Sequence, residues 1–148
     1  MKAALDTNVL AYAEGVNGLR RQDLALRFLR AVPEGTIVIP IQALGELFNV
    51  LVRKAERSRN SARAALLSWR DAFPLVETSA AAVIAASDVA ATHQLSIWDA
   101  VMLSVSAAAG CRLLLSEDLQ EGFTWNGVTV VSPFASTQHA LLKSLLAQ

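Results

Sequence analysis

Four acidic residues stand at places in the chain where carboxylates can gather. Asp6 and Asp118 follow short runs that are expected to be strands. Glu46 and Asp99 lie near the starts of helix-like segments. Carboxylates brought together without basic partners repel one another, and a divalent cation relieves that repulsion. Oxygen ligands without histidine or cysteine suit Mg²⁺ or Mn²⁺ rather than Zn²⁺. The four acids therefore raise the hypothesis of a site for a hard cation.

Three of these acids also have a purely structural interpretation. Asp6 precedes a helix-like run and can serve as its N-cap. Ser96-x-x-Asp99 matches a capping box at the start of a helix. Ser116 to Asp118 fits ordinary turn chemistry.

The periodicity around Glu46 also favours a structural interpretation. At about 100° per residue, Glu46 falls roughly opposite an apolar stripe and beside Ala43, Val50 and Arg53. Periodicity alone therefore predicts a surface glutamate. If Glu46 instead faces a pocket, the stripe must bury against a neighbouring helix or a second subunit. The stripe consists of Leu44, Leu47, Phe48 and Leu51.

Short apolar strands alternate with longer helices along the chain. Strands are expected at 2–6, 36–39, 74–78, 112–116 and 128–131, and helices at 8–14, 19–32, 41–57, 60–72, 79–93, 97–109 and 136–147. This alternation favours parallel βα units, and Asn126-Gly127 can close a small hairpin. Ligands of open parallel sheets collect at the carboxyl ends of the strands. Asp6 and Asp118 are therefore expected on one edge of the sheet, and Asp99 starts the helix that leads into the strand before Asp118.

Length and composition indicate a single domain, residues 1–148. No apolar run reaches the roughly 18 residues that suggest a membrane span, and Asp6 follows Lys2 too closely for a secretory signal peptide. The single Cys111 excludes an internal disulfide and fits a reducing cytoplasm. Cys111 is expected to be a buried thiol, and His93 and His139 are expected to be surface or capping residues.

The net charge is zero, but the charges are unevenly distributed. Residues 20–70 carry ten Arg or Lys and four acids, while the rest of the chain carries three basic and nine acidic residues. Arginine suits bidentate contacts with phosphate. The basic half therefore fits a nucleic-acid backbone, and the alternative is a set of solvated helix faces.

The ordered motifs resemble those of PIN-domain proteins, and more narrowly the VapC-like toxin ribonucleases of bacterial toxin–antitoxin pairs. The matching segments span almost the whole chain: Leu5-Asp6-Thr7-Asn8-Val9-Leu10, Glu46, Trp98-Asp99-Ala100, Leu114 to Gln120, and Val130 to Phe134. The family often has Asn where Ser132 stands, which is a minor departure. The resemblance implies a three-layer α/β/α sandwich on a mainly parallel sheet of about five strands.

The resemblance also implies metal-dependent endonuclease cleavage of single-stranded or structured RNA, by water that Mg²⁺ or Mn²⁺ activates. Asp6 and Asp99 would be direct ligands, and Asp118 would take a second or water-bridged position. Glu46 would bind through water or orient the attacking water. Asn8 and Ser116 would hold the carboxylates in place. The neighbouring acid Glu117 is expected to point away.

An RNA substrate, a protein antitoxin and a homodimer are the implied partners, with no membrane. The apolar stripe is expected to contact a second copy or the helix at 60–72, through Leu44, Leu47 and Phe48. The candidate RNA contacts, which an acidic antitoxin segment could use instead, are Arg53, Lys54, Arg57, Arg59 and Arg63.

Three other functions are alternatives. The first is a stand-alone nuclease in RNA maturation or repair, without an antitoxin. The second is a catalytically silent module that binds nucleic acid or protein, against which the four acids argue. The third is phosphatase or phosphotransfer chemistry of the haloacid dehalogenase type, which needs an Asp two residues after the first, where this chain has Asn8.

Overall fold

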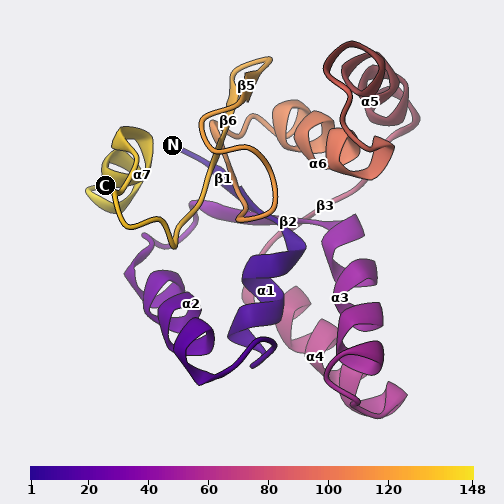
Figure 1. The fold of residues 1–148 in the computed structure, drawn as a ribbon, viewed down its shortest axis with the longest axis vertical. Coiled ribbons are helices and arrows are strands. Elements are labelled where there is room, and N and C mark those ends of the chain that lie inside the picture. Colours follow the sequence, from indigo (N-terminus) through magenta and orange to yellow (C-terminus); the bar gives the residue numbers. More distant parts are fainter.

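A six-stranded sheet with helices on both faces forms the fold, in a computed structural model that describes all residues, 1–148 (Figure 1). The strand order is β3-β2-β1-β4-β6-β5, and every pair is parallel except β5 with β6. The strands are β1 (Ala3–Leu5), β2 (Ile37–Pro40), β3 (Leu75–Val76), β4 (Leu113–Leu115), β5 (Thr124–Trp125) and β6 (Val128–Val131).

The five expected strands are present, and the hairpin at Asn126-Gly127 adds the sixth. Asn126 and Gly127 have φ angles of 46° and 82°, which suit a tight turn between antiparallel strands. The turn lets the two-residue strand β5 pair with β6 at the edge of the sheet.

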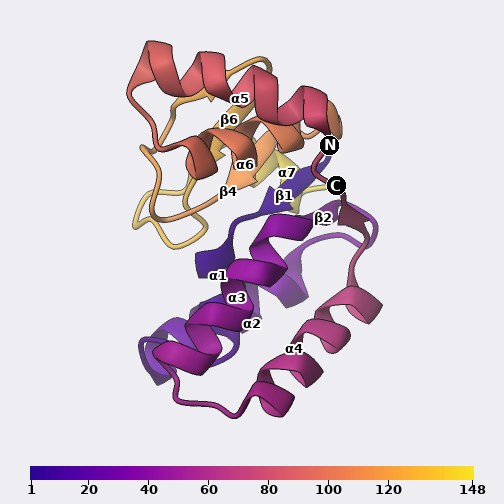
Figure 2. The ribbon, with the colours of Figure 1, turned by 90° about the vertical axis from the view of Figure 1, so that its right-hand side faces the viewer.

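The helices form two layers, one on each face of the sheet (Figure 2). The chain moves in one direction from β1 to β2 to β3, and then crosses back to β4. Because parallel crossovers are right-handed, this reversal puts α1 to α4 on one face and α5 and α6 on the other. The three-layer α/β/α sandwich is thereby confirmed. The helices are α1 (Thr7–Ala13), α2 (Leu19–Ala31), α3 (Ile41–Arg53), α4 (Arg59–Ala72), α5 (Ala80–His93), α6 (Ile97–Ala108) and α7 (Ala140–Leu146).

The reversal of strand order opens a crevice between β1 and β4. All residues of both strands are buried, as expected for parallel strands that are covered on both faces. Leu5 is paired with Leu115 in the β1–β4 register. The residues that follow them, Asp6 and Ser116, therefore leave the sheet side by side at the place where α/β proteins bind ligands.

The apolar stripe of α3 is buried inside the chain. Leu44, Leu47 and Leu51 belong to the same core as Ala62 and Trp69 of α4, and Phe48 packs against this core. Of the two contacts expected for the stripe, the one with the following helix is therefore present. Leu47 is fully buried without a second copy of the chain.

Two helices are shorter than expected from the sequence. α3 ends at Arg53 rather than at 57, because Glu56 takes a left-handed φ of 53° and the Arg57 N–H returns to the Leu51 carbonyl at 3.0 Å. α7 begins at Ala140 rather than at 136. His139 is its N-cap, because Nδ1 of His139 accepts a hydrogen bond from the Leu141 N–H at 3.1 Å. The capping role expected for His139 is thus confirmed.

The thiol of Cys111 is buried, as expected, and burial raises its pKa to about 11. The thiol therefore stays protonated at neutral pH. None of the helices has the length and apolar character needed to cross a membrane.

Truncating Leu47 should test whether the α3 stripe anchors the helix that carries Glu46. Leu47→Ala removes a fully buried side chain and is expected to lower the free energy of unfolding by roughly 2–5 kcal/mol. Leu19→Ala is the matched control, because Leu19 is 83% exposed and its loss should change stability by less than about 0.5 kcal/mol. Urea denaturation followed by circular dichroism measures both, and equal midpoints would contradict the packing described.

Candidate active site

Asp6 stands at the end of β1 and faces the crevice between β1 and β4. Its backbone N–H donates to the Leu115 carbonyl at 3.0 Å, which extends the β1–β4 pairing by one residue. Its Oδ1 accepts a hydrogen bond from the Thr7 N–H at 2.7 Å, so Asp6 is also the N-cap of α1. The capping interpretation is therefore correct, and it leaves Oδ2 available to neighbouring groups in the crevice.

Two polar side chains connect Asp6 with Asp118. The hydroxyl of Ser116 donates to Oδ2 of Asp6 at 2.7 Å and accepts from the Asp118 N–H at 3.2 Å, as in an ordinary turn. Nδ2 of Asn8 lies 3.2 Å from Oδ2 of Asp118 and from the Ser116 hydroxyl, and 3.4 Å from Oδ2 of Asp6. Asn8 and Ser116 thus hold the two carboxylates next to each other.

Glu46 reaches the same crevice from α3. The Thr7 hydroxyl donates to one carboxylate oxygen of Glu46, and Nε2 of Gln42 donates to the other at 2.8 Å. Glu46 is half-buried, whereas periodicity alone predicted a surface residue. Thr7 and Gln42 were not expected from the sequence to take part, although Gln42 lies one turn before Glu46 on the same helix face.

Asp99 lies beside this network rather than within it. Its N–H donates to the Ser96 hydroxyl at 3.2 Å, as the capping box predicts, and its carboxylate accepts no hydrogen bond from the chain. Nε2 of Gln42 lies 3.3 Å from the Trp98 carbonyl oxygen, so the start of α6 adjoins α3 close to Glu46. The structure therefore brings three of the four predicted acids together and places the fourth nearby.

Glu117 is engaged elsewhere, as expected from the sequence. Its Oε1 accepts from Nη1 of Arg21 at 2.5 Å and from the Tyr12 hydroxyl at 3.1 Å. The guanidinium of Arg21 also lies 5.0 Å from the centre of the Tyr12 ring. This pairing keeps the charge of Glu117 out of the cluster formed by its neighbours.

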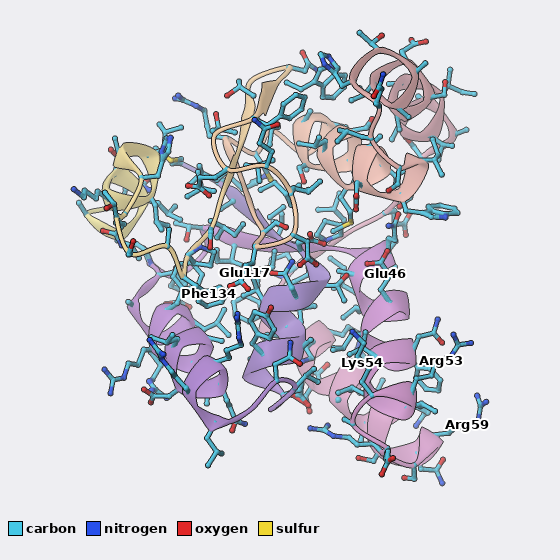
Figure 3. The ribbon with its side chains drawn as sticks, viewed as in Figure 1. Glu46, Arg53, Lys54, Arg59, Glu117 and Phe134 are labelled. Atoms are coloured by element: carbon cyan, nitrogen blue, oxygen red, sulfur yellow. The ribbon has the colours of Figure 1, made fainter.

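A groove of about 400 Å³ runs between α1 and α3 and reaches the acidic residues. Glu46, Asp118 and Asn8 line it. Lys54, the residue that follows α3, lines it as well. Figure 3 shows Glu46 near the start of α3 and Lys54 beyond its other end. The groove therefore has acidic residues and a cation in its walls.

Burial raises the pKa of Asp6 from 3.8 to about 6. Hydrogen bonds from Ser116 and from the Thr7 N–H lower this pKa, while the negative charges of Glu46 and Asp118 raise it. None of the four predicted acids forms an ion pair with an arginine or lysine. The repulsion within the cluster is therefore not neutralised by any side chain of the protein.

The chemistry of the donor set fits a hard cation, although no group of three or more Asp, Glu, His or Cys side chains forms a ready-made cage. All the candidate ligands are carboxylate oxygens, which suit Mg²⁺ or Mn²⁺. His139 caps α7, and the ring of His93 packs against Phe123 with centroids 5.2 Å apart. Neither histidine is therefore a member of the cluster.

Comparison with solved structures shows several proteins with a similar fold. The chain is similar to VapC20 of Mycobacterium tuberculosis, described as a sarcin–ricin loop cleaving toxin, with 21% identity, a TM-score of 0.66, and coverage of 79% of this chain and 90% of that one. It is similar to a toxin–antitoxin complex from Klebsiella pneumoniae, with 22% identity, a TM-score of 0.66, and coverage of 90% and 98%. It is also similar to DNA-bound VapBC from Salmonella typhimurium, with 16% identity, a TM-score of 0.64, and coverage of 90% and 98%.

No curated protein matches the chain significantly. The family model for the PIN domain matches residues 3–121, a range that includes the whole acidic cluster, the residues that support it and Asp99. The matched range covers most of the sequence and agrees with the three-layer fold, and the chain therefore belongs to the PIN domain family.

Proposed function

We propose that this protein is a metal-dependent endoribonuclease whose active site is the acidic cluster at the crevice between β1 and β4. The observation that carries the proposal is the gathering of Asp6, Glu46 and Asp118, none of which is paired with a basic residue, beside a groove that Glu46 and Asp118 line. Membership of the PIN domain family supports the proposal. The description of the similar VapC20 as a sarcin–ricin loop cleaving toxin supports it further.

Asp6, Asp99 and Asp118 would hold Mg²⁺ or Mn²⁺, with Glu46 taking part through water. When bound, the cation lowers the pKa of water and neutralises charge on the phosphoryl group and on the leaving oxygen. The uncompensated charge around Asp6 is the reason to expect the ion at this place.

The remaining polar residues of the site orient the carboxylates. Ser116 and Asn8 hold Asp6 and Asp118 by hydrogen bonds, and such supporting contacts set the direction in which a carboxylate presents its free lone pairs. Thr7 and Gln42 each donate to one oxygen of Glu46. These contacts support a role in which Glu46 would bind the cation through water or orient the attacking water.

The toxin of a toxin–antitoxin pair is the cellular role that we propose, with a protein antitoxin and a homodimer as its assemblies. One of the similar structures is described as a toxin–antitoxin complex and another as DNA-bound VapBC, which supports this role. Expression of the chain with the product of a neighbouring gene, followed by purification of the complex, tests it. A nuclease that is active and needs no inhibitor for its expression would favour the stand-alone alternative.

Replacing Asp6 should abolish cleavage without unfolding the protein. Asp6→Asn keeps the size of the side chain but removes the charge at the centre of the cluster, and cleavage of total RNA with Mg²⁺ or Mn²⁺ is expected to fall by about 100-fold or more. End mapping of the fragments measures cleavage, and circular dichroism checks the fold. Asp88→Asn, on the exposed surface of α5, should remain active. Full activity of Asp6→Asn would refute the site.

The raised pKa of Asp6 makes stability depend on pH when no metal is present. The pKa of Asp6 is about 6 in the folded protein, whereas its ordinary value is 3.8, so the folded state keeps a proton that the unfolded chain releases. Stability is therefore lost as pH rises from 4 to 6, by about 3 kcal/mol at most. In EDTA at pH 7.5, Asp6→Asn is expected to resist urea better than the unchanged protein, and this advantage should vanish near pH 4. Equal urea midpoints of Asp6→Asn and the unchanged protein at pH 7.5 would contradict the destabilising effect of burying the charged Asp6 carboxylate.

Binding of the cation should offset that cost. Mn²⁺ or Mg²⁺ at 100 times its dissociation constant would stabilise the folded protein by about 2.7 kcal/mol, measured as a rise in melting temperature at pH 7.5. Asp6→Asn should show a much smaller rise, and Asp88→Asn the full rise. Equal shifts in all three proteins would mean that the ion binds elsewhere.

A further inference from the structure

The groove between α1 and α3 has an acidic end and a cationic end. Glu46 and Asp118 line it near the start of α3, and Lys54 lines it beyond the end of the same helix. At 1.5 Å per residue, the eight residues from Glu46 to Lys54 correspond to a rise of about 12 Å. Lys54 is therefore placed for a phosphate next to the one at the acidic cluster, rather than for that phosphate itself.

The structure divides the five candidate cations into two groups. Arg57 is already engaged, because its Nη1 lies 2.9 Å from Oε1 of Glu14 and its Nη2 lies 2.7 Å from the Glu14 carbonyl oxygen. The other four candidates are exposed and form no ion pair: Arg53, Lys54, Arg59 and Arg63.

Three of these free cations gather where α3 ends and α4 begins. Figure 3 shows Arg53, Lys54 and Arg59 toward the end of α3 that is opposite to Glu46. We call these three residues the α3–α4 corner. The only acid between α3 and α4 is Glu56, so the corner keeps a net positive charge.

On the basis of the proposed ribonuclease function, we propose that the groove and the α3–α4 corner bind the backbone of a single RNA strand. Lys54 contacts the phosphate next to the scissile one, and Arg53 and Arg59 contact phosphates beyond it. A strand whose scissile phosphate lies at the acidic cluster must leave the crevice, and the groove leads from there to the free cations. Phosphate contacts of this kind supply affinity and position rather than base specificity.

Salt-dependent binding of RNA tests this assignment. The probe is a fluorescein-labelled single-stranded oligoribonucleotide of mixed sequence, measured by anisotropy with Mg²⁺ in an Asp6→Asn background that prevents cleavage. Lys54→Gln is expected to weaken binding by roughly three- to tenfold at low salt. It should also reduce the slope of log K against log salt by about 0.7, the value for one phosphate contact on a single strand. Arg53→Gln and Arg59→Gln should act in the same direction.

Lys143→Gln is the matched control, because Lys143 is an exposed cation without an ion pair on α7. It removes the same charge and should leave both affinity and slope unchanged. In the cleavage-competent protein, Lys54→Gln should raise KM more than it lowers kcat, since Lys54 positions RNA away from the scissile bond.

Three other results would each contradict a different part of the proposal. A Lys54→Gln variant with the original salt slope refutes the phosphate contact. A variant that binds RNA normally but loses a co-purified antitoxin assigns the corner to a protein partner instead. If the unchanged protein cleaves no RNA with Mg²⁺ or Mn²⁺, the proposed function itself fails, and that result is distinguishable from an unaffected Lys54 variant of an active enzyme.

Discussion

A carboxylate buried without a cationic partner is the constraint on which the site depends. Asp6 sits at the end of a buried strand, and both burial and the charges of Glu46 and Asp118 raise its pKa to about 6. A buried charge of this kind costs stability unless it is paired or bound to a metal. The chain supplies hydrogen bonds from Ser116 and Thr7 but no cation. The site is therefore built at the expense of stability, which is typical of groups kept for binding or chemistry.

The order of the strands explains why these acids meet although they are far apart in the sequence. β1 and β4 are neighbours because the chain reverses its direction across the sheet after β3. The pairing of Leu5 with Leu115 then brings Asp6 next to Ser116, which donates to it. The buried stripe on the opposite side of α3 turns Glu46 toward the crevice. The register of β1 and β4 thus positions Asp6 and Ser116, and the packing of α3 positions Glu46.

The layers, the strand edge and the capping role of Asp6 could be predicted because they follow from local patterns. Alternating short apolar strands and helices indicated a parallel sheet, and a carboxylate between a strand and a helix indicated both a cap and a ligand. The half-burial of Glu46 could not be predicted, because periodicity shows which face of a helix is apolar but not what covers the polar face. The pairing of Arg57 with Glu14 could not be predicted either, because the two residues are 43 positions apart in the sequence. A count of charged residues does not show which arginines are paired.

Separation of charge lets one groove hold acids and a cation without their cancelling each other. Lys54 lines the same groove as Glu46 and Asp118 but forms no ion pair with either of them, and the backbone rise from Glu46 to Lys54 is about 12 Å. Lys54 therefore cannot replace a metal ion at the acidic cluster, and the cluster does not reduce the charge that Lys54 offers to a phosphate. A lysine one turn from Glu46 would pair with it and close the crevice to a cation. Glu117, which is next to Asp118 in the sequence, is paired with Arg21, and Arg57 is paired with Glu14, so neither adds its charge to the groove.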